Sequence, residues 1–257
     1  MKNLKKKKKK KLYIVKQIKQ QEIKALKRAA KYRREFLGNV SHELKTPIFN
    51  IQGYVHTLLD GALYDDNVNK KYLDRTSKSI DRLIAIIDDL DSLARLESAE
   101  LKLEKTSWDI LELIKEVFDS FEVKSQKSQI ELILPKKKRP IMVFADRNQI
   151  TQVLHNFISN AIKYGKIDGY VKCSVVNKEE RVSVSIEDNG IGIEEKNIPR
   201  LFERFYRVDK GRSREEGGTG LGLAIVKHIL ETHGEEISVV SKKGLGTKFS
   251  FSIKKDS

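Results

Sequence analysis

The 257-residue chain has a single cysteine, Cys173, and therefore cannot form an intrachain disulfide. Such a chain fits a reducing compartment. The sequence also lacks a run of 18 or more apolar residues and a secretory h-region, so it predicts neither a membrane span nor export. Its length suffices for two modest domains, each with its own core. We therefore expect a globular chain with a cytoplasmic location.

Net positive charge is small outside the N-terminal segment. Residues 1–35 carry +14 of the formal net charge of +15, and the remaining residues are almost neutral. No aromatic residue interleaves with the lysines of 5–11, so we expect no nucleic-acid binding. A polybasic run is attracted to anionic lipid head groups, which predicts possible membrane proximity through the basic N-terminus. A solvated run without a partner, or a non-native extension, is an equally good interpretation.

Two long segments in the first hundred residues have helical apolar periodicity. The first predicts a coiled coil that leads into a helix ending near Leu59, where Asp60 and Gly61 favour a C-terminal cap. Two antiparallel helices with one stripe each cannot close a core alone, which predicts a homodimer with a four-helix bundle. The first stripe comprises Val15, Ile18, Ala25, Ala29, Tyr32, Phe36 and Val40, and the second Leu73, Ile80, Leu83, Ile87, Leu90 and Ala94.

The string FLGNVSHELKTP, residues 36–47, places reactive side chains on neighbouring turns of the first helix. Thr46 follows His42 by four residues and therefore lies over the same helix face. Glu43 is positioned to take or orient the Nδ1 proton, which leaves Nε2 as a nucleophile. Pro47 lacks an N–H and predicts a kink just beyond the histidine.

From Trp108 onward the pattern alternates between helix and strand. One layer of helices on a largely antiparallel sheet is the α+β packing that this order favours. Residues 100–107 read as a linker, with Thr106 or Ser107 as the cap of the next helix. The expected helices cover residues 108–123, 147–164 and 221–233, and the expected strands 129–134, 141–144, 170–177, 181–187, 236–241 and 247–253.

Three short motifs lie on this predicted frame. Asn156, Asn160 and Lys163 share one helix face, where an amide oxygen suits Mg²⁺ and a lysine suits phosphate. The motif EDNGIGI, residues 187–193, places a carboxylate at a strand end before two glycines that let the backbone approach a flat base. The motif GGTGLGL, residues 217–223, opens a helix whose free N–H groups attract phosphate oxygens. A Walker-type P-loop is absent.

Residues 36–47 resemble the phosphoacceptor box of the sensor histidine kinases of two-component systems. The three later motifs, in this order, are similar to that family's N, G1 and G2 boxes, and FERFYRVD at 202–209 is similar to its F box. The resemblance extends from Phe36 to Ile253. It implies an α-helical hairpin dimerising into a four-helix bundle, followed by an α+β sandwich of the Bergerat type. The implied domains are a basic tail and signalling helix (1–35), a dimerisation and phosphotransfer domain (36–99), a linker (100–107) and a catalytic ATP-binding domain (108–257).

The resemblance also implies roles for individual residues. His42 would be phosphorylated, Glu43 would assist as base, Thr46 would position water for dephosphorylation, and Arg207 would lie near the γ-phosphate. Residues 190–218 would form a lid over ATP. Asp188 would bind the adenine amino group and Asn160 would ligate Mg²⁺. The remaining implied nucleotide contacts are Asn156, Lys163 and Tyr164 for phosphate or ribose, Gly190 and Gly192 beside the base, and Gly218, Thr219, Gly220, Leu221 and Gly222 around the phosphates.

The expected activity is autophosphorylation of His42 followed by transfer to an aspartate of a response regulator, with phosphatase action on that partner. If the chain is the excised portion of a longer sensor, its location is the cytoplasmic face of the membrane. Two alternatives stay open. An ATPase-driven clamp or chaperone would use a similar nucleotide domain but lacks a phosphoacceptor box. A dimeric scaffold or phosphatase-only regulator would bind nucleotide without transfer to His42.

Overall fold

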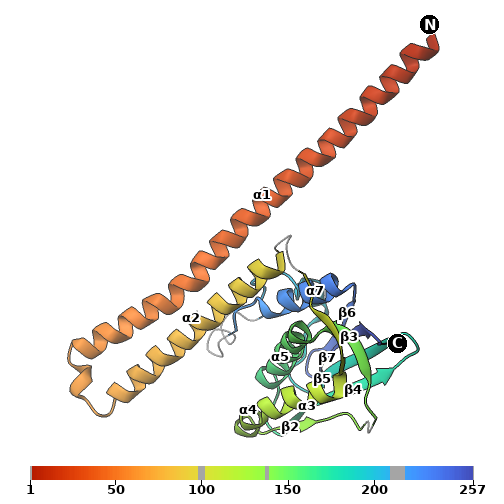
Figure 1. The fold of residues 1–257 in the computed structure, drawn as a ribbon. Coiled ribbons are helices and arrows are strands. Elements are labelled where there is room, and N and C mark those ends of the chain that lie inside the picture. The colour runs from red at the N-terminus through yellow and green to blue at the C-terminus, as the bar shows by residue number, and fades with distance from the viewer. Residues whose placement is uncertain (1, 98–101, 137–138, 209–217, 257) are drawn as a thin grey trace. The chain divides into compact units, whose positions relative to one another are not determined.

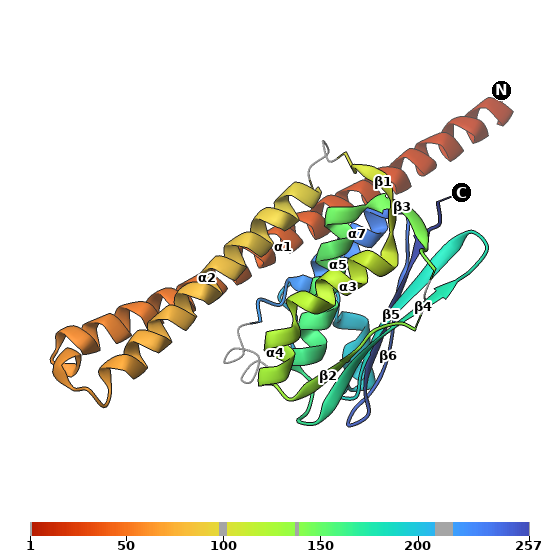
Figure 2. The same cartoon turned by 60° about the horizontal axis from the view of Figure 1, so that its bottom comes forward.

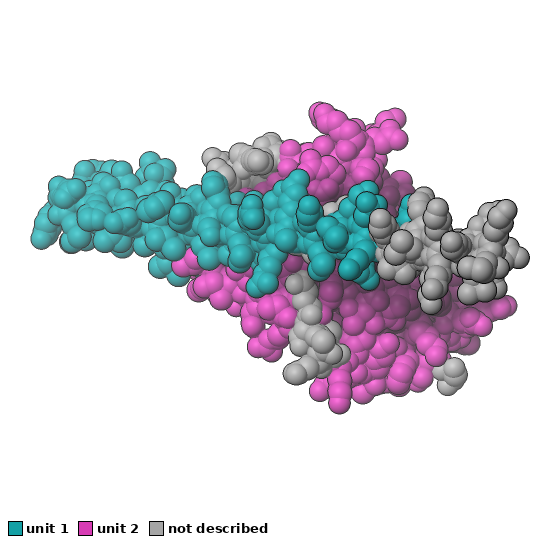
Figure 3. All heavy atoms as spheres, turned by 90° about the horizontal axis from the view of Figure 1, so that it is seen from above, with its two compact units in different colours: residues 1–80 teal, residues 81–257 magenta. Residues whose placement is uncertain are grey.

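The computed structural model describes residues 2–97, 102–136, 139–208 and 218–256 (Figure 1). The chain divides into two compact units, residues 1–80 and 81–257, which Figure 3 shows in teal and magenta. The division falls inside a helix rather than at the expected linker. Each unit is described by itself.

The first unit is a helical hairpin. Helix α1 spans Lys2–Leu59 and includes the lysine run, and Pro47 lies inside it without ending it. The chain turns at Gly61, whose φ of 119° belongs to the left-handed region that glycine tolerates, and then forms the 3-10 helix η1 (Ala62–Tyr64). Helix α2 spans Asn69–Glu97. The predicted end of the first helix and the predicted second helix are both confirmed.

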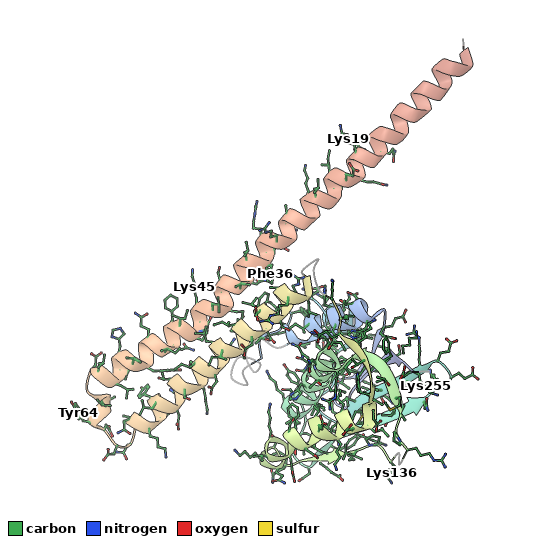
Figure 4. All side chains as sticks on the ribbon, in the orientation of Figure 1. Lys19, Phe36, Lys45, Tyr64, Lys136 and Lys255 are labelled. Atoms are coloured by element: carbon green, nitrogen blue, oxygen red, sulfur yellow. The ribbon has the colours of Figure 1, made fainter. Side chains whose placement is uncertain are left out.

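Aromatic side chains join the two helices of the hairpin near its turn, which Tyr64 marks in Figure 4. The rings of Tyr54 on α1 and Tyr72 on α2 lie 5.9 Å apart, and the Arg75 guanidinium lies 5.9 Å from the Tyr54 ring. Leu58, which follows Tyr54 by one turn of α1, is buried. These contacts hold α1 and the start of α2 antiparallel.

The second unit is built on a five-stranded sheet of order β2-β4-β5-β7-β6. Only the β2/β4 pair is parallel, so the predicted, largely antiparallel sheet is confirmed. A second, two-stranded sheet pairs β1 with β3. The strands are β1 (Lys105–Asp109), β2 (Ile130–Ile133), β3 (Met142–Asp146), β4 (Gly169–Asn177), β5 (Arg181–Asp188), β6 (Ile237–Lys242) and β7 (Gly246–Lys254).

Helices cover one face of the five-stranded sheet (Figure 2). The α5 residue Phe157 is 1% exposed and stacks on Phe249 of β7 at 5.0 Å between ring centroids. Alternation along β7 places Phe249, Phe251 and Ile253 in this core, while the serines between them face the other side. The helices are α3 (Ile110–Ser120), α4 (Glu122–Lys127), α5 (Arg147–Lys163), the 3-10 helix η2 (Glu195–Arg200) and α7 (Gly222–His233).

The sequence interpretation was wrong at the start of this unit. Trp108 lies in β1, not in a helix, and residues 105–107 of the expected linker belong to the same strand. The Trp108 Nε1–H donates to the Ala145 carbonyl at 2.8 Å, which explains why this aromatic residue joins the small sheet. The cap of α3 is Asp109, whose Oδ1 accepts the Leu111 N–H at 3.1 Å, instead of Thr106 or Ser107.

Among the described residues, no helix combines the length and the apolar character that crossing a membrane requires. The stretch 209–217, which is part of the expected lid 190–218, lies outside the described residues.

Candidate active site

A cavity of about 650 Å³ opens between α5, the end of β5 and the start of α7. Two predicted nucleotide residues, Gly190 and Leu221, do not line it. In the sequence the others are spread over more than 60 positions, and the fold brings them around one cavity. The predicted residues that line the cavity are Asn156, Asn160, Lys163, Tyr164, Asp188, Gly192, Arg207, Gly218, Thr219, Gly220 and Gly222.

Helix α5 carries the amide side chains of the cavity. It begins where the Asp146 Oδ1 accepts the Gln149 N–H at 3.2 Å, as the capping-box pattern predicts. Asn156 and Asn160 are one turn apart and are both half-buried. At the end of the helix, the Lys163 Nζ lies 5.3 Å from the centre of the Tyr164 ring. The helix thus presents two amides and one ammonium group to the same space.

Asp188 is the buried acid of the site. It ends β5, is 8% exposed, and accepts the Gly190 N–H at 2.9 Å. Burial raises the pKa of its carboxyl to about 6, although the N–H groups of Gly190 and Thr247 oppose this rise in pKa. At neutral pH the group is mostly ionised, and an ionised carboxylate that lines the cavity can only accept hydrogen bonds.

Two glycines of the EDNGIGI motif are required by packing. A Cβ on Gly190 would collide with the Tyr164 carbonyl oxygen, and one on Gly192 would collide with the Lys242 carbonyl oxygen. Gly192 also has a φ of 62°. The loop therefore closes against the end of α5 and the end of β6, which fixes the cavity wall behind Asp188.

The GGTGLGL segment packs against the F box and against the Asn156 amide of α5. The Phe205 N–H donates to the Gly220 carbonyl at 2.8 Å, and a Cβ on Gly220 would lie 3.3 Å from the Arg207 Nε. Gly222 begins α7 so close to the Asn156 amide that a Cβ there would collide with its Oδ1. These contacts place residues of the F box, the N box and the GGTGLGL segment around one space.

Leu221 has a structural position in this segment. Its side chain is completely buried, while its N–H donates to the Thr219 Oγ1 at 3.1 Å. Leu221 does not line the cavity, and its side chain anchors the turn in the core.

Sequence reasoning missed several residues of the cavity wall. Thr247 on β7 is paired in register with Asp188, a neighbour relation that the spacing of the motifs does not reveal. Lys124 on α4 also lines the cavity and lies 3.4 Å from the Ser159 hydroxyl. Asp89 reaches it from α2. A correct prediction of the β5/β7 register would have identified Thr247 as the cross-strand partner of Asp188.

The phosphoacceptor string lies on α1, where it begins at the Phe36 label of Figure 4 and ends two residues after the Lys45 label. His42 is exposed to solvent and Glu43 is half-buried. The Thr46 hydroxyl donates to the His42 carbonyl at 3.2 Å, so the two residues share a helix face as predicted. None of these three residues lines the cavity.

The donor set of the cavity suits a metal that is held largely by phosphate. The described residues contain no group of three or more His, Cys, Asp and Glu side chains that could hold a metal ion. Asn160 offers a single amide oxygen in the cavity. Mg²⁺ commonly takes one or two protein oxygens and completes its shell with water and phosphate oxygens, so this wall is compatible with it.

Comparison with known proteins identifies both parts of the chain. Residues 32–99 match the model of the His Kinase A (phospho-acceptor) domain, and residues 145–257 match that of the histidine kinase-, DNA gyrase B- and HSP90-like ATPases. The chain belongs to the sensor histidine kinases of two-component systems. The helical hairpin and the α+β unit of this kinase are therefore its phosphoacceptor and ATPase regions.

The sequences of two similar proteins align with most of this chain. The sensor histidine kinase WalK of Bacillus subtilis (strain 168) is 39% identical over 223 residues, which are 86% of this chain and 36% of that protein. A sensor protein kinase WalK of Staphylococcus aureus is 36% identical over 86% of this chain and 53% of its own length. The chain thus spans between about a third and about half of these relatives.

Among solved structures, histidine kinase ThkA in complex with the response regulator protein TrrA superposes with a TM-score of 0.71 at 30% identity. The match covers 86% of this chain and 61% of that chain. Full-length ShkA in complex with AMPPNP has a TM-score of 0.64 at 26% identity, covering 87% of this chain and 46% of that one.

Proposed function

We propose that this chain is an ATP-dependent protein-histidine kinase that phosphorylates its own His42 and passes the phosphoryl group to an aspartate of a response regulator. One observation carries the proposal. A single cavity gathers the buried carboxylate of Asp188, the amides of α5 and the start of α7. The same chain presents an exposed histidine in a phosphoacceptor string.

The proposed nucleotide contacts follow from the cavity wall. The ionised Asp188 accepts a hydrogen bond from the adenine amino group, because this buried carboxylate lines the cavity. Asn156, Lys163 and Tyr164 contact ribose or phosphate. The N–H groups around Gly220 and Gly222 at the start of α7 attract phosphate oxygens. The match of the ATPase model and the AMPPNP bound to ShkA support this assignment.

The chemistry at α1 is a phosphoryl transfer. The His42 Nε2 lone pair forms a bond to the γ-phosphorus, and the bond from that phosphorus to the bridging oxygen breaks, releasing ADP. Glu43 takes or orients the Nδ1 proton, which keeps Nε2 unprotonated for the attack. Arg207, half-buried beside Gly220, neutralises charge on the transferred group. Mg²⁺ held by Asn160 and the phosphates would supply further charge neutralisation.

The second half of the reaction involves a partner protein. We propose that the phosphorylated His42 donates to an aspartate of a response regulator, because the similar kinase ThkA forms a complex with such a regulator. Phosphatase action on that partner is part of the proposal. It rests on Thr46, whose hydroxyl donates to the helix backbone and keeps its oxygen lone pairs for a water molecule.

Incubation of the full chain with γ-labelled ATP and Mg²⁺ tests the kinase proposal. We expect label on the protein that is stable in base and lost in acid, as for a phosphoramidate. Added response regulator receiver domain is expected to remove the label from the kinase. Tight ATP binding with no label would instead support the scaffold or phosphatase-only alternative. ATP turnover without protein label would support the clamp.

Exposed apolar side chains along the hairpin support a homodimer. On α2 they recur at spacings of seven, four and three residues, which places them on one face. Ile80 and Ile84 are 43% and 51% exposed in the single chain. Water-exposed stripes of this kind are normally covered by another copy or by a partner. The exposed apolar residues of α2 are Leu73, Ile80, Ile84 and Ile87.

Ile80→Glu is expected to weaken the dimer at least 100-fold, because a buried, unpaired carboxylate would replace an apolar contact. Sedimentation velocity at micromolar concentration measures the shift to monomer. Lys78→Glu is the matched control, because Lys78 is exposed and lies about 160° around the helix from Ile80. A dimer equally stable in both variants would contradict the assigned face.

A further inference from the structure

An acidic residue of the phosphoacceptor region reaches the nucleotide cavity. Asp89 belongs to α2, inside the part of the chain that matches the phosphoacceptor model. It also belongs to the second compact unit and lines the cavity together with the glycines of the G2 box. Its carboxylate accepts a hydrogen bond from the Thr219 hydroxyl. The phosphate-binding segment is therefore engaged by an anionic group of the protein itself.

Two further contacts hold this part of α2 against the ATPase region. The Gln152 amide of α5 donates to the Ser92 hydroxyl at 2.8 Å. The His228 Nε2 on α7 lies 2.8 Å from the Leu96 carbonyl. Contacts at residues 89, 92 and 96 recur at helical spacing, so one face of α2 is docked. This explains why the division between the compact units falls within α2.

The Asp89 carboxylate lies in a partly desolvated position. Burial raises its pKa, the Thr219 hydrogen bond lowers that pKa, and the neighbouring Asp88 raises it. Among the residues that the structure describes, the other charged side chains that line the cavity are Lys124, Lys163, Arg207 and Asp188. A negative charge here is screened less than at an open surface, so it acts strongly on any anion that enters.

We propose that Asp89 is an internal competitor for the nucleotide phosphates. Its carboxylate takes the Thr219 hydroxyl, a donor within the segment that the proposed function assigns to phosphate, and its charge opposes a triphosphate. ATP binding and docking of α2 at residue 89 therefore oppose each other. Binding of ATP favours release of α2 from the G2 box, and docked α2 lowers ATP affinity. The inference rests on the proposed function.

Affinities of the full chain for two ligands test the competition. ATP with Mg²⁺ carries the phosphates, and adenosine presents the base and ribose without charge. Asp89→Asn removes the charge and keeps the shape, and we expect it to tighten ATP binding about five- to twentyfold. Adenosine affinity is expected to change less than about twofold. Calorimetric titration at low salt measures both, and the gain for ATP is expected to shrink at high salt.

Asp88→Asn is the matched control, because it removes the same charge from an exposed position one residue earlier. We expect it to change ATP affinity less than about twofold, and Asp89→Glu to retain weak binding. Asp89→Ser serves as a second neutral variant should the asparagine variant not fold.

Equal ATP affinity in Asp89→Asn and the unchanged protein would overturn the inference. An equal gain for adenosine would also overturn it, since that result indicates a structural effect without competition for phosphate. Failure of the unchanged protein to bind ATP would refute the proposed function itself. Failure of this inference alone leaves ATP binding and His42 labelling intact, so the two failures are distinguishable.

Discussion

His42→Gln is expected to abolish incorporation of label from γ-labelled ATP while ATP affinity stays within about twofold. Glutamine keeps a polar side chain of similar length on α1 but has no lone-pair nitrogen that can attack phosphorus. His42 is exposed and does not line the nucleotide cavity, so binding is expected to survive. Autoradiography at early times measures labelling, and calorimetric titration with ATP and Mg²⁺ measures binding.

His56→Gln is the matched control for this experiment. His56 is exposed on the same helix and is expected to be dispensable for labelling. Label that persists in His42→Gln would refute the assignment of the acceptor. Loss of label in both variants would point to a general effect on α1 and not to the chemistry of one imidazole.

Asp188→Asn is expected to weaken ATP binding at least 100-fold. Asp188 is 8% exposed, and in the proposed complex its carboxylate accepts a hydrogen bond from the adenine amino group. An asparagine accepts with one uncharged oxygen only, and its NH₂ then faces one of the two donors, the Gly190 N–H or the adenine amino group. Together the weakened bond and an unsatisfied buried donor cost about 3 kcal/mol, which is roughly a hundredfold in affinity. Calorimetric titration with an ATP analogue measures the change.

The control for Asp188→Asn is the same change at an exposed aspartate, Asp168→Asn, which is expected to leave affinity within about twofold. Asp168 has a φ of 56°, a region that asparagine also tolerates. Thermal unfolding of both variants separates loss of the site from loss of the fold. Tight ATP binding by a folded Asp188→Asn protein would contradict the assignment of the adenine contact.

Most elements of the fold were predictable because their signals are local. The Asp146 cap, the apolar periodicity of α2 and the alternation along β7 each depend on residues that are at most seven positions apart in the chain. Trp108 was misassigned because its position depends on pairing with β3, more than 30 residues later. A large aromatic residue beside a helix start satisfies the helical pattern equally well, and only the partner strand decides.

The site shows the same division. Motif chemistry predicted the carboxylate of Asp188 and the amides of α5, and both line the cavity. Gly190 was expected beside the base, yet its missing side chain is required by the Tyr164 carbonyl behind the wall. Thr247 and Asp89 carry no motif of their own. Thr247 pairs with Asp188, 59 positions earlier, and Asp89 contacts Thr219, 130 positions later. Only the fold brings these residues together.

The sequence by itself determined the family, the two helical stripes, the order of the motifs and the exposed phosphoacceptor string, because each depends on residue types at short spacing. The tertiary structure alone decided which side chains share the nucleotide cavity and which glycines are needed for packing. It also decided that Asp89 of α2 engages the Thr219 hydroxyl. Contacts between distant segments depend on how helices and strands pack, and short-range patterns do not encode those distances.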